Sequence, residues 1–180
     1  GRYYTSASIS FLEPWLGGKK PNALSVGVYY SYQDDGFWNT SGTSDYYISI
    51  LGGSVSLATR LKWPDDYFTF IHGIAYQQYN VKNYKYLTAM PTGISNNINY
   101  NFTLARNSVD QLIYPRQGSE ISVQGQMTFP YSLVNGKDYT NLSPQERYKW
   151  LEYYKINVRA SWFFNLFDDL VVSTRARFGF

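Results

Sequence analysis

Apolar and polar residues alternate along most of this sequence, and the alternation limits the folds that the chain can adopt. In residues 97–105, Ile98, Tyr100, Phe102 and Leu104 alternate with polar or small residues. Successive side chains of a β-strand point to opposite faces, so this segment would have one apolar face and one polar face. The pattern therefore predicts strands whose two faces meet different surroundings.

The same alternation recurs often enough to predict about eight strands. Most of them are about 10 residues long, which suits a tilted strand that crosses a bilayer in about 9–11 residues. The predicted strands cover residues 3–12, 23–32, 46–62, 67–79, 97–105, 119–129, 153–162 and 170–180. In the predicted strand at 67–79, His72 shares the apolar face with aromatic and aliphatic residues. A position near the membrane interface or a local bulge would account for this histidine.

The aromatic content narrows the fold class. The chain has 19 Tyr, 11 Phe and 5 Trp among 180 residues, yet its mean hydropathy is negative. It has no apolar run of about 18–20 residues, which a membrane-spanning helix would need. In a transmembrane barrel, apolar lipid-facing residues alternate with polar lumen-facing residues, so the mean hydropathy of the chain stays low although it has many aromatic residues. We therefore expect an all-β, antiparallel, up-and-down transmembrane barrel in a bacterial outer membrane, with residues 1–180 as a single region.

The predicted connections alternate between short and long, as periplasmic turns and extracellular loops do. The compact connections lie near residues 13–22, 63–66, 106–118 and 164–169, and the longer ones near 33–45, 80–95 and 130–152. In the last long connection, Ser143, Pro144 and Glu146 form a capping-box pattern that predicts a short helix over 145–151. The doublet Gly52-Gly53 suggests a bend or bulge in its long strand.

Few residues offer catalytic or metal chemistry. The chain has no cysteine, its net charge is only +3, and its basic residues are dispersed, so disulfides, thiolate metal sites and nucleic-acid binding are not expected. His72 is the only histidine and lacks identifiable partners. The acidic pairs suit solvated turns: Asp34-Asp35, Asp65-Asp66 and Asp168-Asp169. We therefore expect that the protein is not an enzyme and that it has no catalytic residue, no metal site and no cofactor.

Arg60, Arg159, Arg175 and Arg177 fall on the predicted polar faces. They suit either a hydrated lumen wall or a basic interior that pairs with an acidic inserted loop or plug. Aromatic residues gather near predicted strand ends and suggest membrane-interface girdles: Phe11, Trp15, Trp63, Tyr67, Tyr153, Tyr154 and residues 162–164. No secretion signal precedes the first predicted strand, so we expect the chain to belong to a longer exported protein.

Two turns resemble those of a known family. Residues 10–21 contain Glu13, Pro14, Trp15, Gly17 and Gly18 and resemble its strand–turn–strand. In residues 106–119, Asp110 precedes an aromatic–Pro pair, Tyr114-Pro115, and then Gly118, which opens the next strand. This order resembles the second turn of the BamA family of outer-membrane assembly factors, Bacteroidetes type. The resemblance spans essentially the whole chain.

The resemblance implies a sixteen-stranded barrel in which this chain supplies roughly the fourth to eleventh strands. Members of the family fold and insert β-barrel proteins into the outer membrane without nucleotide or cofactor. The implied partners are outer-membrane lipids, unfolded outer-membrane protein substrates and accessory assembly lipoproteins. The family's POTRA domains, its seam strands and the loop that threads into its lumen would lie outside residues 1–180.

A complete small barrel of eight strands, with a structural or adhesive role, is the alternative. Ala176, Phe178 and the terminal Phe180 share one face, which mimics the aromatic end of a complete outer-membrane protein. In such a barrel, residues 3–12 would pair with residues 170–180. In part of a larger barrel, these two segments would be separate edges.

Overall fold

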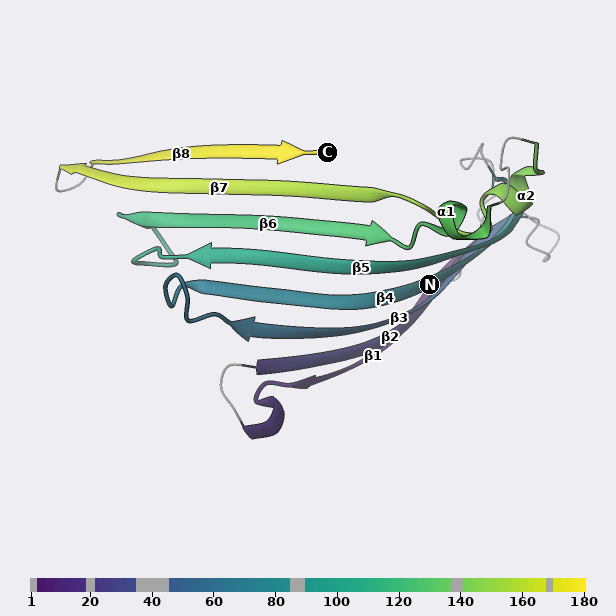
Figure 1. The fold of residues 1–180 in the computed structure, drawn as a ribbon, viewed down its shortest axis with the longest axis horizontal. Helices are drawn as coiled ribbons and strands as arrows, with labels where there is room; N and C mark the ends of the chain where they lie inside the picture. Colours follow the sequence, from purple (N-terminus) through teal and green to yellow (C-terminus); the bar gives the residue numbers. More distant parts are fainter. Residues whose placement is uncertain (1–2, 19–21, 35–45, 85–89, 137–140, 168–169) are drawn as a thin grey trace.

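The computed structural model describes residues 3–18, 22–34, 46–84, 90–136, 141–167 and 170–180. They form one sheet of eight strands in which each strand pairs with the next along the chain (Figure 1). The strands are β1 (Tyr4–Glu13), β2 (Asn22–Asp34), β3 (Tyr47–Arg60), β4 (Phe68–Lys82), β5 (Gly93–Asn107), β6 (Gly118–Thr128), β7 (Tyr154–Phe167) and β8 (Leu170–Gly179). All eight predicted strands are confirmed.

The sheet is curved, antiparallel and open (Figure 1). β1 and β8 occupy its two opposite edges and do not pair with each other. The pairing of residues 3–12 with 170–180 that a closed eight-stranded barrel requires is therefore absent, and that alternative is not favoured. The up-and-down antiparallel prediction is confirmed.

The strand registers place the apolar residues in continuous rows across the sheet. One row holds Phe11, Val26, Val55, Ile74, Tyr100, Met127 and Tyr154, each opposite the next. The adjacent row on the other face holds Ser10, Gly27, Ser54, Ala75, Asn99 and Thr128. The predicted alternation is thus one apolar face and one polar face of a single sheet.

The apolar face has no protein layer over it in the described part of the chain. In the described ranges only Val81 on the polar face, Met90 outside the strands and Ala160 are buried hydrophobic residues. Ile9 and Ile74 of the apolar face are 77% and 60% exposed. Charged residues of this face occur only at or next to the last position of a strand: Glu13, Asp34, Lys82 and Arg106. This is the pattern of a strand wall in contact with lipid, where a charge is costly near the bilayer centre.

Several strands extend further than their hydrophobic pattern. β4 and β5 remain paired as far as Val81 and Gly93, so their connection covers residues 83–92 and is no longer than the one at 108–117. The predicted difference in length between these two connections is therefore wrong. Backbone hydrogen bonds continue through polar residues, beyond the point where the apolar alternation stops.

The long connection between β6 and β7 contains two short helices, α1 (Tyr131–Asn135) and α2 (Pro144–Arg147). The Ser143 hydroxyl caps α2 by accepting from the Glu146 amide, as predicted, but the predicted extent to residue 151 is wrong. The chain leaves the helix to pair with β5: Asn96 N donates to Lys149 O at 2.8 Å, and Leu151 N donates to Asn96 O at 3.0 Å. Neither described α-helix is long and apolar enough to cross a membrane.

Of the alternatives given for His72 and for Gly52-Gly53, the bulge is absent at both places. His72 is the fifth of the 15 residues of β4 and lies on the apolar face, with its ring 5.2 Å from the Phe70 ring, and both neighbouring registers run through it without a shift. The register is also continuous at Gly52, where a Cβ atom would overlap the ring of Tyr29. The only register shift in the described strands lies between Asn165 and Phe167.

The last predicted turn also needs correction. β7 continues to Phe167, through the position where the turn was expected to begin. The pair Asp168-Asp169 and the second residue of Asp34-Asp35 lie outside the described residues. We call the end of the sheet with the β1–β2, β3–β4 and β5–β6 connections the turn end; α1 and α2 lie at the other, the loop end (Figure 1).

Candidate functional site

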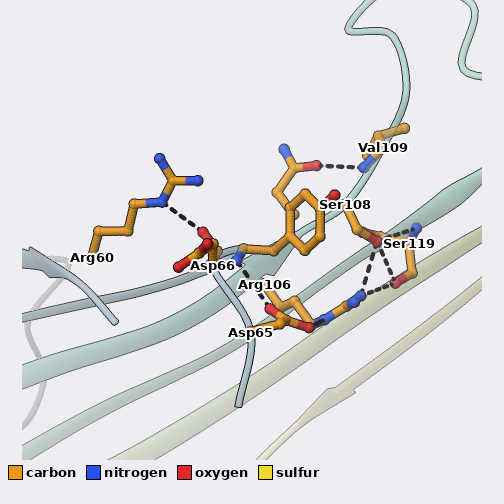
Figure 2. Close-up of polar contacts among 9 residues, drawn as sticks. Arg60, Asp65, Asp66, Arg106, Ser108, Val109 and Ser119 are labelled. Atoms are coloured by element: carbon orange, nitrogen blue, oxygen red, sulfur yellow. Dashed lines mark hydrogen bonds and ion pairs between the residues drawn. The ribbon is translucent and has the colours of Figure 1, made fainter. Parts of the chain in front are cut away.

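A cluster of polar side chains joins two neighbouring connections at the turn end (Figure 2). Arg106 lies near the end of β5 on the apolar face, and its Nε is 2.9 Å from Asp65 Oδ2 of the β3–β4 turn. Its Nη1 donates to Ser108 Oγ at 2.9 Å and to Ser119 Oγ at 2.8 Å. A charge at the border of the lipid-facing wall is thus compensated by groups from three segments.

Hydrogen bonds between residues close in sequence also stabilise the β3–β4 turn. Tyr67 N donates to the other oxygen of the Asp65 carboxylate at 3.0 Å, and Arg60 Nε donates to the Asp66 carbonyl oxygen at 2.6 Å. The Arg106 guanidinium lies 5.5 Å from the centre of the Tyr67 ring. Asp65 therefore lies in a partly exposed turn, as expected, and also forms an ion pair with Arg106, while Arg60 contributes to the same turn.

Removing the Arg106 charge should loosen the turn end. Arg106→Met leaves the Asp65 carboxylate without its cation, and we expect the folded barrel to lose about 1 kcal/mol, because both side chains are partly exposed. The free energy of unfolding in detergent should report this loss. Arg116→Met is the control, since the Arg116 side chain is outside the cluster. A double-mutant cycle with Asp65→Asn should give a coupling energy above zero, and additive effects would contradict the ion pair.

Asp110 organises the β5–β6 turn through its carboxylate. Its Oδ1 accepts from the backbone N–H groups of Gln111 and Arg116, both at 3.0 Å, and of Gln117 at 3.2 Å. Desolvation acts to raise the pKa of this carboxyl, but the N–H groups of Gln117, Arg116 and Gln111 outweigh it, so the pKa lies below its ordinary value. The motif aspartate therefore works as a backbone cap of the turn.

Gly118 and Tyr114 have unusual backbone conformations in the same turn. Gly118 has φ +108°, and a Cβ atom there would overlap the Ser108 carbonyl oxygen and lie 2.9 Å from Val109 Cα. Tyr114, just before Pro115, has φ +56°. This backbone conformation and the close approach of residue 108 favour glycine at the position where the chain enters β6.

The β1–β2 turn repeats this arrangement. Glu13 Oε1 accepts from Trp15 N at 3.1 Å, with Pro14 between them. Gly17 and Gly18 have φ values of +70° and +71°. Each motif turn thus combines a carboxylate that accepts from at least one backbone N–H group with at least one glycine of positive φ.

The polar face carries a hydrogen-bonded network towards the loop end. The Gln77 amide donates to Tyr29 OH at 2.7 Å and accepts from Asn97 Nδ2 at 3.2 Å. Asn97 also donates to Tyr153 OH at 3.1 Å, and Gln126 donates to the same hydroxyl at 2.8 Å. The network connects β2, β4, β5 and β6 with the residue before β7, and the alternation alone does not reveal it.

The registers place Arg159, Arg175 and Arg177 on the polar face of β7 and β8. Arg159 is directly opposite Arg177, and Arg175 is opposite Ser161. All three arginines are exposed. In the part of the chain that the structure describes, none of them forms an ion pair.

No three His, Cys, Asp or Glu residues in the described ranges lie close enough to hold a metal ion. The arrangement joins turns and strands to one another and presents two contrasting faces. Its features are therefore two contrasting faces, hydrogen-bonded turns at one end and a basic patch on the polar face.

Comparison with known proteins shows the family to which the chain belongs. The family model for the Omp85 superfamily domain matches residues 1–180. No curated protein matches the sequence. Among the solved structures that match is BamA from Haemophilus ducreyi lacking POTRA domains 1–3, with a TM-score of 0.64 and 16% identity over 99% of this chain and 33% of that one.

The BamA structure shares the fold of this chain, which spans about a third of its length. The resemblance of the two turns to the BamA family agrees with this match, while the Bacteroidetes type stays a prediction. Because the family model covers every residue, the chain belongs to the Omp85 superfamily.

Proposed function

We propose that this chain is the barrel portion of an outer-membrane assembly factor that folds and inserts β-barrel proteins into the outer membrane. The observation that carries the proposal is the match of the Omp85 superfamily model to residues 1–180, and 99% of the chain also shares the fold of the BamA structure from Haemophilus ducreyi. An apolar face without charges between the strand ends supports it further, because such a face is compatible with lipid. The proposed location is a bacterial outer membrane.

The proposed activity requires no bond chemistry. Local thinning of the bilayer and pairing of substrate strands would lower the barrier to insertion, so we propose that the protein is not an enzyme and uses no cofactor. Its partners would be outer-membrane lipids, unfolded outer-membrane proteins and accessory assembly lipoproteins. Within this mechanism, the sheet acts as a wall, and the Arg106–Asp65 pair keeps its turn end in one conformation.

An insertion assay with the full-length protein tests this proposal. Liposomes containing the protein should fold an added urea-denatured outer-membrane protein several-fold faster than empty liposomes, as measured by protection from protease. Liposomes that contain an unrelated outer-membrane barrel control for defects in the bilayer. Equal rates with the two barrels would refute the proposed activity.

A further inference from the structure

The polar face has an unbalanced charge. Among the residues of the eight strands, it carries the basic side chains Arg60, Lys155, Arg159, Arg175 and Arg177 and only one acidic side chain, Glu120. Arg60 binds the β3–β4 turn. The other four basic residues lie on β7 and β8, and we call them the basic wall.

The geometry of the basic wall increases the repulsion between its charges. Arg159 and Arg177 are direct partners across the two strands, and like charges directly opposite each other are destabilising. Glu120 is opposite Ser161, so it lies diagonal to Arg159, but it forms no ion pair with the basic wall. The basic wall therefore has no anionic partner among the described residues.

The polar-face side chains that surround Lys155 of the basic wall carry amide groups and no carboxylate. Gln124 and Gln126 of β6 lie opposite Asn157 and Lys155 of β7. With Asn101, these residues border a depression of about 370 Å³. Side-chain amides donate and accept hydrogen bonds, so this surface can bind a peptide backbone beside the charged groups.

We propose that the basic wall binds an acidic polypeptide segment inside the barrel. The inference rests on the proposed function in one respect, which is that the polar face lines a barrel interior. Guanidinium groups bind carboxylates through two parallel hydrogen bonds. Arg175 and Arg177 are two residues apart on one strand, or roughly 7 Å, which is the spacing of alternate side chains in an extended acidic segment.

Site-specific photo-cross-linking in the full-length protein tests the inference. A benzoylphenylalanine at Ser161, which is opposite both Glu120 and Arg175, should cross-link to a peptide rich in Asp and Glu, identified by mass spectrometry. Benzoylphenylalanine at Ser10, on the polar face of distant β1, is the matched control and should not capture that peptide.

The charge dependence of the cross-link is the decisive measurement. The yield from position 161 should fall at least five-fold when Arg159, Arg175 and Arg177 are all changed to Gln, and largely return when all three are changed to Lys. Heat-modifiable migration in gels identifies the variants that are folded. If the Gln variant does not fold, the fall in yield with added salt in the otherwise unchanged protein gives the same test.

Three outcomes would overturn the inference: no peptide cross-link at position 161, a cross-link to lipid only, or a peptide cross-link that depends on neither the arginines nor salt. The insertion assay on the same preparations separates the two proposals. A protein that is active in insertion but lacks the charge-dependent cross-link would refute the acidic segment alone, whereas an inactive protein with the cross-link would refute only the assembly function.

Discussion

The Phe102→Lys variant of the full-length protein is expected to reach the outer membrane in folded form at a strongly reduced level. Phe102 lies on the apolar face of β5, opposite His72 on β4 and Gly125 on β6. Lysine on the lipid face near the bilayer midplane costs about 2–4 kcal/mol. The variant also loses the phenyl ring that occupies the space left by Gly125, so the effect should be among the largest of any single substitution.

Thr103→Lys is the matched control for this variant. Thr103 is the next residue of the same strand, but it lies on the polar face, opposite Ile71 and Gln124. Lysine there can remain hydrated, so the folded level should stay close to that of the unchanged protein. Heat-modifiable migration of outer-membrane fractions measures both levels. Equal loss in both variants would contradict the assignment of the two faces.

The faces could be predicted from the sequence because each strand separates two different environments. Side chains of β5 alternate between the apolar and polar faces, so the pattern at 97–105 identifies both a strand and its orientation. Strand ends lack such a signal. Asn96 and Gln78 are polar residues on the apolar face, and the hydrogen-bond ladder continues through them without regard to polarity.

The local part of the candidate site was also predictable. In both motif turns, a carboxylate caps backbone N–H groups within a few residues, so the order of residues contains the necessary information. The Arg106–Asp65 pair joins residues 41 positions apart and depends on the β4–β5 register. The sequence did contain one signal. Arg106 follows Phe102 and Leu104 on the same face of the strand, and a charge on that apolar face needs a partner.

The Gly118→Ala variant is expected to destabilise the folded barrel by roughly 2–4 kcal/mol. An alanine is strained at φ +108°, and its Cβ would overlap the Ser108 carbonyl oxygen. Because this oxygen belongs to the backbone, it cannot move away by a change of side-chain rotamer. The Ser108 amide pairs with Ser119 O, and Ser119 Oγ accepts from Arg106. Displacing residue 108 should therefore also weaken the Arg106 cluster, because the same residues hold both.

Gly27→Ala is the control that separates backbone strain from the general effect of adding a methyl group to this sheet. Gly27 lies within β2 on the polar face, and a Cβ there would have ordinary contacts of 3.7–3.9 Å. Its stability should change by less than about 1 kcal/mol, since a strand tolerates alanine at least as well as glycine. Urea unfolding in detergent, followed by tryptophan fluorescence, measures both variants. If Gly118→Ala unfolded at the same urea concentration as Gly27→Ala, the β5–β6 turn would not need glycine at its last position, and the close approach of residues 108 and 118 would be wrong.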